Sequence, residues 1–422
     1  MGRARRHRAL TALLAAVVAG LLVVPAGATA VADRDGGTAY ADAGEALRRS
    51  TDEHAGRTHA HPPGTFQNSI VGAGHTAAEQ DGPLAGNPSL PTGFADVKVI
   101  GNITEATSVD FAPNGTAFVA LKTGVIKSFD YNGATGQFEG NASSTDFANL
   151  TQQVHNYHDR GLTGIAVDPQ FPTRPYIYVN YSYNRDPRDN PPVVPRWGPP
   201  GQAYDTCPQP ADPGDTSITG CVGMDRVTRL TATQGANGWV MAPGSEVELL
   251  ASGCYQFGSH ASGDVAFGPD GKLYASSGEG ASFDTLDYGQ YANPCADPTN
   301  EGGSLRSQDY RSSSDPLGVD GSVVRMNPDT GVTPTQANAT SWLVAFGQRN
   351  PWRLTFRPKA DGSGLSNELW SADVGASKAE EVNRVPDVTQ VNAPINRGWP
   401  CYEGANGQSL VNPSWTPPAD GI

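Results

Sequence analysis

One histidine lies inside the most regular part of the sequence, where its ring could act as a general base. His260 stands in the segment Gly258–Asp264, directly before a run of small and apolar residues with strand character. An imidazole titrates near neutral pH, so a histidine at the entrance of a buried strand can take a proton from a bound hydroxyl group. The alternative is a loop histidine whose ring only hydrogen-bonds to backbone groups.

A second polar cluster, Gly347–Arg353, is dense in planar side chains and also precedes a short apolar run. Arg349 offers a guanidinium fork suited to carboxylates or quinone oxygens. Asn350 adds an amide beside it. The structural alternative is that Arg349 caps backbone carbonyls.

Two segments have the residue types of a metal site. His155 and His158 form a His-x-x-His pair followed by Asp159, but no third ligand follows at a zinc-type spacing, which favours ordinary loop residues. The turn Asp373–Asn383 combines carboxylates with backbone carbonyls, and Ca²⁺ takes six to eight such oxygens. Acidic surface turns are common, so this pattern alone is a weak indication.

These segments adjoin a hairpin theme that recurs four times. Each copy has a mostly apolar or small-residue run, a tight Pro/Gly turn and a second run rich in β-branched and aromatic residues. The copies begin at Ser108, Gly164, Asp264 and Leu354. Repeated hairpins with variable insertions are typical of β-propeller blades, whereas a β-sandwich would not repeat the theme. We therefore expect an all-β propeller whose first strand in each copy is buried on both faces.

The composition excludes several classes of protein. Gly contributes 50 and Pro 34 of the 422 residues, which indicates many turns and short strands. The formal net charge is −14, with no basic block apart from the extreme N-terminus. A chain this acidic is a poor candidate for binding nucleic acid or an anionic membrane surface.

The N-terminus has the pattern of a secretory signal peptide over residues 1–30. Arginines at positions 3 to 8 precede an apolar run from Ala9 to Val24, and Ala28–Ala30 supplies small residues for cleavage. The run is short for a membrane span, although an uncleaved anchor is the alternative. Residues 31–94 lack apolar periodicity and indicate a flexible leader, which leaves residues 95–422 for the propeller. We expect a secreted, extracellular protein without stable membrane insertion.

The cysteines lie beyond the signal segment, so disulfides are permitted. Cys207 with Cys221 and Cys254 with Cys295 are plausible pairs, but the sequence cannot fix the pairing, and Cys401 is left over. The first pair lies in one of two long insertions, residues 183–221 and 280–316. Binding residues often gather in such loops, although surface elaboration without function is equally compatible.

Taken in order, six segments resemble the soluble quinoprotein glucose/sorbosone dehydrogenase family, and the resemblance runs from about Gly93 to Pro400. They are Arg160–Pro169, His260–Gly280, Gly321–Asp329, Gly347–Trp352, Glu380–Asn383 and Asn396–Pro400. Members of this family are secreted six-bladed β-propellers that oxidise sugars with pyrroloquinoline quinone and Ca²⁺. The resemblance implies an oxidoreductase that oxidises an aldose or related sugar and passes electrons to a soluble or membrane acceptor.

The resemblance also implies roles for the residues of the first cluster. His260 matches the base that removes the proton of the sugar's anomeric hydroxyl group. Glu279 stands where an Asp that orients the base is frequent, so it keeps the charge with a longer reach. Asp159 stands where a substrate-contacting Gln can occur, which leaves the choice of sugar open.

Further residues match the cofactor positions of the family. Arg349 and Asn350 match residues that contact the reactive carbonyl side of the quinone, where donors stabilise developing negative charge. Gly375 and Ala376 match two positions whose backbone carbonyls bind the Ca²⁺ that polarises the cofactor. The family more often has Pro at the second of these positions, and a carbonyl ligand survives that change.

The resemblance bears on the length of the chain as well. In the family about two further blades follow the position matched by Trp399 and Pro400, and they carry basic residues that hold the cofactor's carboxylates. We therefore expect a C-terminally truncated propeller of about four blades. Two other functions stay open: a non-catalytic calcium-dependent carbohydrate-binding propeller, and an inactive truncated fragment.

Overall fold

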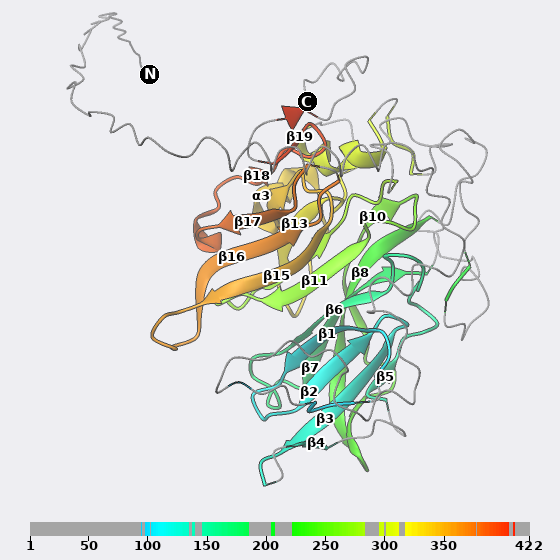
Figure 1. Cartoon of the computed structure of the whole chain (residues 1–422), viewed down its shortest axis with the longest axis vertical. Coiled ribbons are helices and arrows are strands. Elements are labelled where there is room, and N and C mark those ends of the chain that lie inside the picture. Colours follow the sequence, from blue (N-terminus) through cyan, green and yellow to red (C-terminus); the bar gives the residue numbers. More distant parts are fainter. Residues whose placement is uncertain are drawn as a thin grey trace, which may run out of the picture. The chain divides into compact units, whose positions relative to one another are not determined.

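Four mainly antiparallel sheets follow one another along the chain in the computed structural model (Figure 1). The described residues are 94, 98–101, 103–134, 137–139, 146–184, 204–206, 222–282, 295–298, 301–311, 317–376, 378–404 and 408–409. The predicted signal peptide and almost all of the predicted leader lie outside them, as do Cys207 and Cys221. All described residues belong to one contact unit, Phe66–Ile422.

The first two sheets each begin with one of the predicted hairpins. The first sheet has the order β1-β2-β3-β4, with β5 also paired to β3, and consists of β1 (Ala106–Phe111), β2 (Ala117–Leu121), β3 (Val125–Asn132), β4 (Gln137–Glu139) and β5 (Ala148–Asn149). The second has the order β6-β7-β8-β10, with β9 paired to β8, and consists of β6 (Leu162–Val167), β7 (Tyr176–Tyr183), β8 (Gly223–Gly235), β9 (Gly238–Met241) and β10 (Val247–Tyr255).

The other two predicted hairpins open the third and fourth sheets. The third comprises β11 (Ser262–Phe267), β12 (Leu273–Ser277), β13 (Ser322–Met326), β14 (Leu343–Phe346) and the parallel strand β18 (Ile395–Asn396). The fourth comprises β15 (Pro351–Pro358), β16 (Leu365–Asp373) and β17 (Glu381–Val385). The remaining elements are the ribbon β19 (Tyr402–Glu403) and β20 (Gln408–Ser409), the helix α3 (Ala339–Trp342) and the 3₁₀ turns η2 (Gly303–Arg311), η3 (Gln336–Asn338) and η4 (Val388–Gln390).

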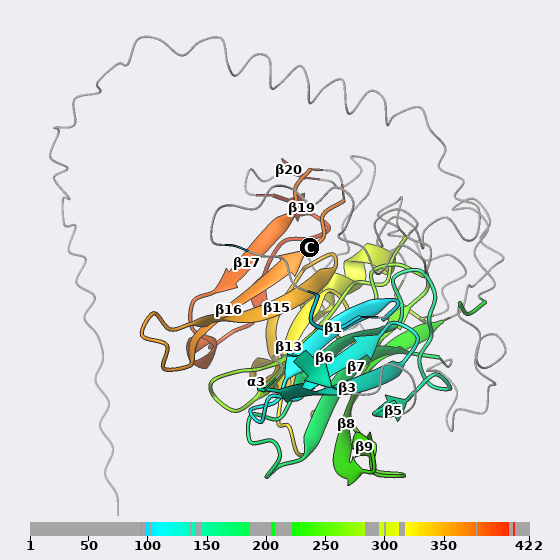
Figure 2. The same cartoon turned by 60° about the horizontal axis from the view of Figure 1, so that its bottom comes forward.

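The first strands of the four sheets lie next to one another in the order β1, β6, β11 and β15 (Figures 1 and 2). Each sheet extends away from its first strand through strands that follow in the sequence. This is the arrangement of propeller blades. The described part of the chain is therefore mostly β, with four propeller-like blades, as the hairpin repeat predicts.

Polar side chains join the inner strands of different blades. The guanidinium of Arg353 in β15 donates hydrogen bonds to the carbonyl of Thr163 in β6 (3.1 Å) and to that of Thr107 in β1 (2.6 Å). The carboxylate of Asp264 in β11 accepts a hydrogen bond from the backbone N–H of Leu354 (3.2 Å). These bonds fix the strands that carry the site segments at their ends.

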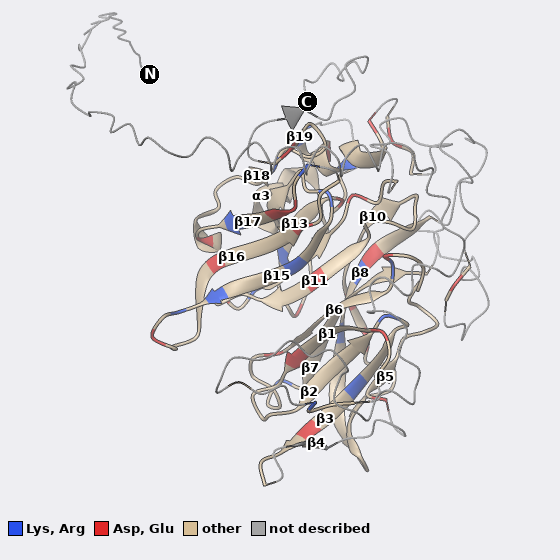
Figure 3. Ribbon diagram, in the orientation of Figure 1, with Lys and Arg blue, Asp and Glu red and all other residues tan. Residues whose placement is uncertain are grey.

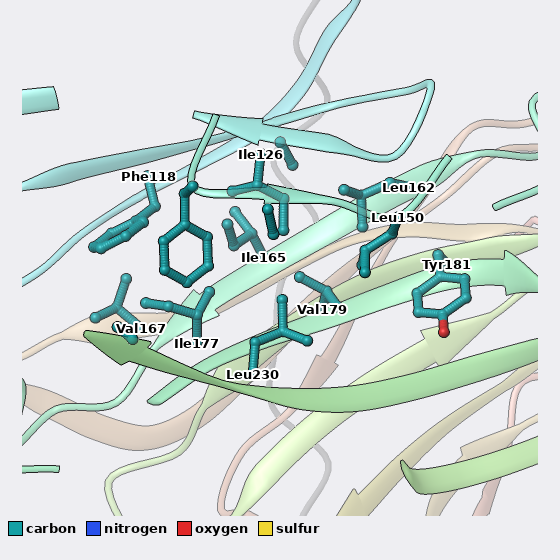
Figure 4. Packing of buried hydrophobic residues seen from close by; sticks show 14 of the residues in the cluster. Phe118, Ile126, Leu150, Leu162, Ile165, Val167, Ile177, Val179, Tyr181 and Leu230 are labelled. Atoms are coloured by element: carbon teal, nitrogen blue, oxygen red, sulfur yellow. The ribbon is translucent and has the colours of Figure 1, made fainter. Parts of the chain in front are cut away.

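Apolar side chains fill the space between neighbouring blades. Phe118 and Ile126 of the first blade pack against Ile165, Ile177 and Leu230 of the second (Figure 4). Full burial of each such side chain contributes about 1.5–3 kcal/mol. Packing between blades therefore holds neighbouring sheets together.

The predicted burial of the inner strands is correct for β6 and wrong for β1. All six residues of β6 are buried, whereas Val109 and Phe111 in β1 are 50% and 56% exposed. Several residues in the second half of β15 are exposed too. The reason is position: β6 and β11 lie between two described inner strands, while β1 and β15 each have one such neighbour.

The two ends of each hairpin differ in accessibility. The segments that precede an inner strand lie at one end, and the tight turns lie at the other. Gly271 and Gly362 belong to two of these turns, and a Cβ placed at either would meet no atom within 4 Å. At the turn ends of these hairpins there is therefore open space for an added side chain.

A disulfide joins Cys254 at the end of β10 to Cys295. This is one of the two pairs that the sequence suggested. Cys401 is a free thiol. Within the described residues no helix is long and apolar enough to cross a membrane, and basic and acidic residues are interspersed over the strands (Figure 3).

Buried carboxyls, Asp320 and Asp264 among them, are expected to make the folded protein less stable as the pH rises. Burial raises the pKa of Asp320 to about 7 and that of Asp264 to about 6, from an ordinary value of 3.8. At a pH between the ordinary pKa and the raised pKa, each carboxyl is protonated in the folded chain and ionised in the unfolded chain. Unfolding therefore releases protons, and a higher pH favours unfolding. Each carboxyl then costs about 1.4 kcal/mol of stability per pH unit.

Urea unfolding at pH 5, 6, 7 and 8 measures this effect. The free energy of unfolding is expected to fall from pH 5 to pH 7, and the fall is expected to be smaller in Asp320→Asn, which is neutral throughout. Equal slopes in the two proteins would contradict the assignment to Asp320.

Candidate active site

His260 and Glu279 face each other across the open end of the β11–β12 hairpin. His260 precedes β11 and Glu279 follows β12, so the pairing of Ser262 with Ser277 brings them together. The Nδ1 atom of His260 lies 2.6 Å from Oε1 of Glu279, and the two side chains are 2% and 0% exposed. His260 adopts a left-handed backbone (φ 46°), uncommon outside glycine and often found at functional sites. The predicted base and its predicted orienting carboxylate are thus in direct contact.

The backbone around this pair is tightly packed. Gly278 N donates to the carbonyl of Ala261 (2.8 Å), and Gly280 N donates to the carbonyl of His260 (2.9 Å). A Cβ at Gly278 would collide with the carbonyl group of His260. Only glycine at position 278 allows the two segments to approach this closely.

The second oxygen of Glu279 is held by a residue from far along the chain. Trp399 Nε1 donates a hydrogen bond to Oε2 of Glu279 (3.0 Å). The backbone N–H of Glu279 donates to the carbonyl of Arg349 (2.9 Å). Glu279 therefore joins the β11–β12 hairpin to the two polar segments that flank the fourth blade.

Asp159, which precedes β6 of the second blade, lies beside His260. Its Oδ2 atom accepts a hydrogen bond from the backbone N–H of His260 (3.1 Å), and its own N–H donates to the carbonyl of Gly258 (3.0 Å). The side chain is partly exposed. The predicted substrate contact thus lies beside the predicted base and also supports its backbone.

Arg349 and Asn350, before β15, are fixed by a buried carboxylate. Asp373, at the end of β16, accepts hydrogen bonds from the backbone N–H groups of Arg349 (3.2 Å) and Asn350 (2.7 Å). Burial raises the pKa of Asp373 to about 7, and the negative charges of Glu381 and Glu279 raise it further. The guanidinium of Arg349 lies 5.7 Å from the ring of Trp399, within the range of a cation–π contact.

The predicted metal ligands Gly375 and Ala376 belong to the turn after β16. The Gly375 carbonyl accepts a hydrogen bond from Nη1 of Arg349 (3.0 Å), which also donates to the carbonyl of Val374 (3.2 Å). The N–H of Ala376 donates to Oε1 of Glu403 (2.6 Å). In this arrangement Arg349 caps backbone carbonyls, the structural role that the sequence left open for it.

The His-x-x-His pair is part of an aromatic and cationic cluster. His155 Nδ1 lies 3.0 Å from Nη1 of Arg160, and the His155 ring stacks on Tyr157 at 5.7 Å. In the part of the chain that the structure describes, no three or more His, Cys, Asp or Glu side chains converge as a metal site. In the first long insertion the structure describes residues 183–184 and 204–206, and in the second it describes 280–282, 295–298 and 301–311. In the second insertion the carboxylate of Asp297 pairs with the guanidinium of Arg306 (2.8 Å).

Two residues of the site carried no predicted role. Trp399 lies in one of the six family-like segments, but nothing in its neighbours indicates that its indole reaches Glu279. Asp373 stood only at the edge of the acidic turn, although a carboxylate at the end of a strand is a recurrent partner for backbone N–H groups. Trp399 reaches Glu279 because β18, just before it, joins the third sheet. Asp373 reaches the backbone N–H groups of Arg349 and Asn350 through the pairing of β15 with β16.

Comparison with known proteins gives one family match and several distant relatives. The sequence matches the family described as Glucose / Sorbosone dehydrogenase over residues 103–202 and 244–410. The HIPL2 protein of Arabidopsis thaliana is 28% identical over 285 residues, which are 64% of this chain and 37% of that protein. Quinoprotein glucose dehydrogenase B of Acinetobacter calcoaceticus is 24% identical over 253 residues, 59% of this chain and 41% of that protein.

A similar solved structure is the PQQ-bound form of aldose sugar dehydrogenase from Streptomyces coelicolor. It has 19% sequence identity and a TM-score of 0.47, and the match covers 74% of this chain and 67% of that chain. The chain spans less than half the length of the curated relatives that it matches.

Proposed function

Because the chain belongs to the glucose/sorbosone dehydrogenase family, we propose that it oxidises an aldose or related sugar with pyrroloquinoline quinone. The observation that carries the proposal is the contact of 2.6 Å between His260 and Glu279, beside Arg349 and Asn350. A buried imidazole paired with a carboxylate is the arrangement of a general base.

Each side chain of this cluster has a part in the proposed reaction. An ionised Glu279 only accepts hydrogen bonds, so Nδ1 of His260 carries the proton and Nε2 presents a lone pair. Nε2 takes the proton of the sugar's anomeric hydroxyl group, and Glu279 stabilises the imidazolium that forms. Asp159 holds the backbone N–H of His260 and offers its partly exposed carboxylate as a hydrogen-bond acceptor to the sugar.

The residues around Arg349 fit a planar, oxygen-rich cofactor. Arg349 and Asn350 are nearly fully buried, and Oδ1 of Asn350 has no hydrogen-bond partner among the described residues. A buried amide oxygen without a partner is costly, and because it is an acceptor, only a bound group with an N–H or O–H donor would relieve it. When bound there, pyrroloquinoline quinone would supply the acceptor for the two electrons that leave the anomeric carbon. Arg349 and Asn350 would hold its reactive side with charge and hydrogen bonds.

Calcium fits the same turn less well. The Gly375 carbonyl is engaged by a guanidinium at 3.0 Å, and a cation on the same oxygen would meet the positive charge of Arg349. The Gly375 carbonyl can serve as a Ca²⁺ ligand beside Ala376 only if Arg349 turns away from it.

We also propose that the protein is secreted and delivers its electrons to a soluble or membrane acceptor. The signal-peptide pattern of residues 1–30 supports this location, and a disulfide between Cys254 and Cys295 is compatible with an oxidising compartment. N-terminal sequencing of the protein from the culture medium tests it. Recovery of the full-length chain from the cytoplasm alone would contradict it.

Reconstitution tests the proposed activity. The purified chain is incubated with pyrroloquinoline quinone and CaCl₂ and assayed with several aldoses and an electron-accepting dye. Controls omit the quinone, the sugar or the calcium. Sugar-dependent dye reduction is the expected result. A folded protein that binds the quinone and reduces no dye would overturn the proposal, and sugar binding without dye reduction would favour a carbohydrate-binding module.

A further inference from the structure

Trp399 contacts both parts of the candidate site: the pair formed by His260 and Glu279, and the segment that carries Arg349. Its side chain is 5% exposed, its Nε1 donates to Oε2 of Glu279 (3.0 Å), and its ring faces the guanidinium of Arg349. The backbone of Trp399 is itself anchored. Its backbone N–H donates to the carbonyl of Gly347 (2.9 Å), and its backbone carbonyl accepts a hydrogen bond from Oγ of Ser307 (2.9 Å). The indole is thus fixed at the point where base and cofactor residues meet.

We propose that Trp399 is a positioning residue that couples these two parts of the site. Its indole N–H holds one oxygen of Glu279 and so directs the other at Nδ1 of His260. Its ring lies against the guanidinium of Arg349 and supports the side chain in its present orientation. The catalytic consequence rests on the proposed function, whereas the orientation of Glu279 and His260 does not.

The physical reason is that a carboxylate can rotate about its last bond. With Oε2 tied to Trp399, Oε1 stays directed at the ring of His260, and the proton stays on Nδ1. Without the indole N–H, a buried oxygen of Glu279 loses its donor, and the carboxylate rotates to recover one. The proton of His260 then divides between the two ring nitrogens, and Nε2 is less often free to accept.

Trp399→Phe removes the N–H and keeps an aromatic ring under Arg349. Trp342→Phe is the matched control, because Trp342 is also buried (1% exposed) and its Nε1 also donates to a side-chain oxygen, Oδ1 of Asn338 (2.8 Å). Histidine ¹⁵N spectra of the unloaded protein report the tautomer of His260, whose signals are assigned by their absence in His260→Gln.

We expect the Nδ1–H tautomer to dominate in the unchanged protein and in Trp342→Phe, and to be depleted in Trp399→Phe. In the reconstituted enzyme, Trp399→Phe is expected to lower kcat by about 10-fold to 100-fold, since small misplacements of catalytic groups cost this much. KM for the sugar is expected to change little. Unaltered His260 signals in folded Trp399→Phe would overturn the proposal.

A reciprocal measurement covers the case in which Trp399→Phe does not fold. Glu279→Gln keeps the size of the side chain and replaces the charged acceptor. In tryptophan ¹⁵N spectra it is expected to move the indole signal of Trp399 and leave that of Trp342 in place. An unmoved Trp399 signal would overturn the contact. Both spectra are recorded without quinone or sugar, so they decide the matter even if the chain proves to have no dehydrogenase activity.

Discussion

Replacement of His260 with Gln is expected to lower kcat for sugar-dependent dye reduction by about 10²–10⁴-fold, the usual contribution of a general base. Glutamine keeps a polar side chain of similar length and cannot act as a base near neutral pH. The fold is expected to survive, because the apolar side chains that pack within and between the blades stay unchanged. Steady-state kinetics and circular dichroism of the two proteins measure both effects.

A matched control separates the loss of the base from the loss of a ring at a strained position. His158 also has a left-handed backbone (φ 48°), and the proposed reaction gives it no part. His158→Gln is expected to keep most of the turnover. Turnover of His260→Gln near that of the unchanged protein would remove His260 as the base.

Gly278→Ala is expected to abolish the activity and to destabilise the β11–β12 hairpin. The added Cβ would collide with the backbone carbonyl of His260, and backbone cannot yield as a flexible side chain does. Overpacking of this kind costs about 1–3 kcal/mol. The displacement would also separate His260 from Glu279. Thermal unfolding and the dye assay report the two effects.

The turn of the same hairpin provides the comparison. Gly271 has φ 72°, but a Cβ there would meet nothing within 4 Å. Gly271→Ala is expected to cost about 1 kcal/mol from backbone strain alone and to leave turnover intact. If both variants behaved alike, steric contact with His260 would not be the cause of the loss.

The sequence predicts the hairpins well because each has its own local signal. A mostly apolar run, a Pro/Gly turn and a second run define where β11 and β12 begin and end. The same register, extended beyond Ser262 and Ser277, places His260 opposite Glu279. This part of the site therefore follows from local pairing. The family resemblance was needed only to assign roles to His260 and Glu279.

Side-chain contacts that local strand pairing does not specify could not be predicted in the same way. Trp399 approaches Glu279 from 120 residues away, because the chain returns after the fourth blade and adds β18, which lies just before Trp399, to the third sheet. The capping of the Gly375 carbonyl by Arg349 lies within the fourth blade, where the pairing of Pro351 with Asp373 brings the two segments together, but the sequence does not show which carbonyl the guanidinium reaches. The exposure of Val109 and Phe111 was missed for a related reason, since an apolar strand does not reveal how many neighbours it has.

The separation between the site and the hairpin turns has a practical consequence for handling the protein. The turn between β15 and β16 is closed by two backbone hydrogen bonds, from Lys359 N to the carbonyl of Gly364 (2.8 Å) and from Gly362 N to the carbonyl of Lys359 (3.1 Å), and its glycines have open space around them. Exposed turns of this kind are where inserted sequence is tolerated best. An affinity tag, a fluorescent reporter or a new pair of chain ends placed at Gly362 would leave the proton-accepting end of the strands undisturbed.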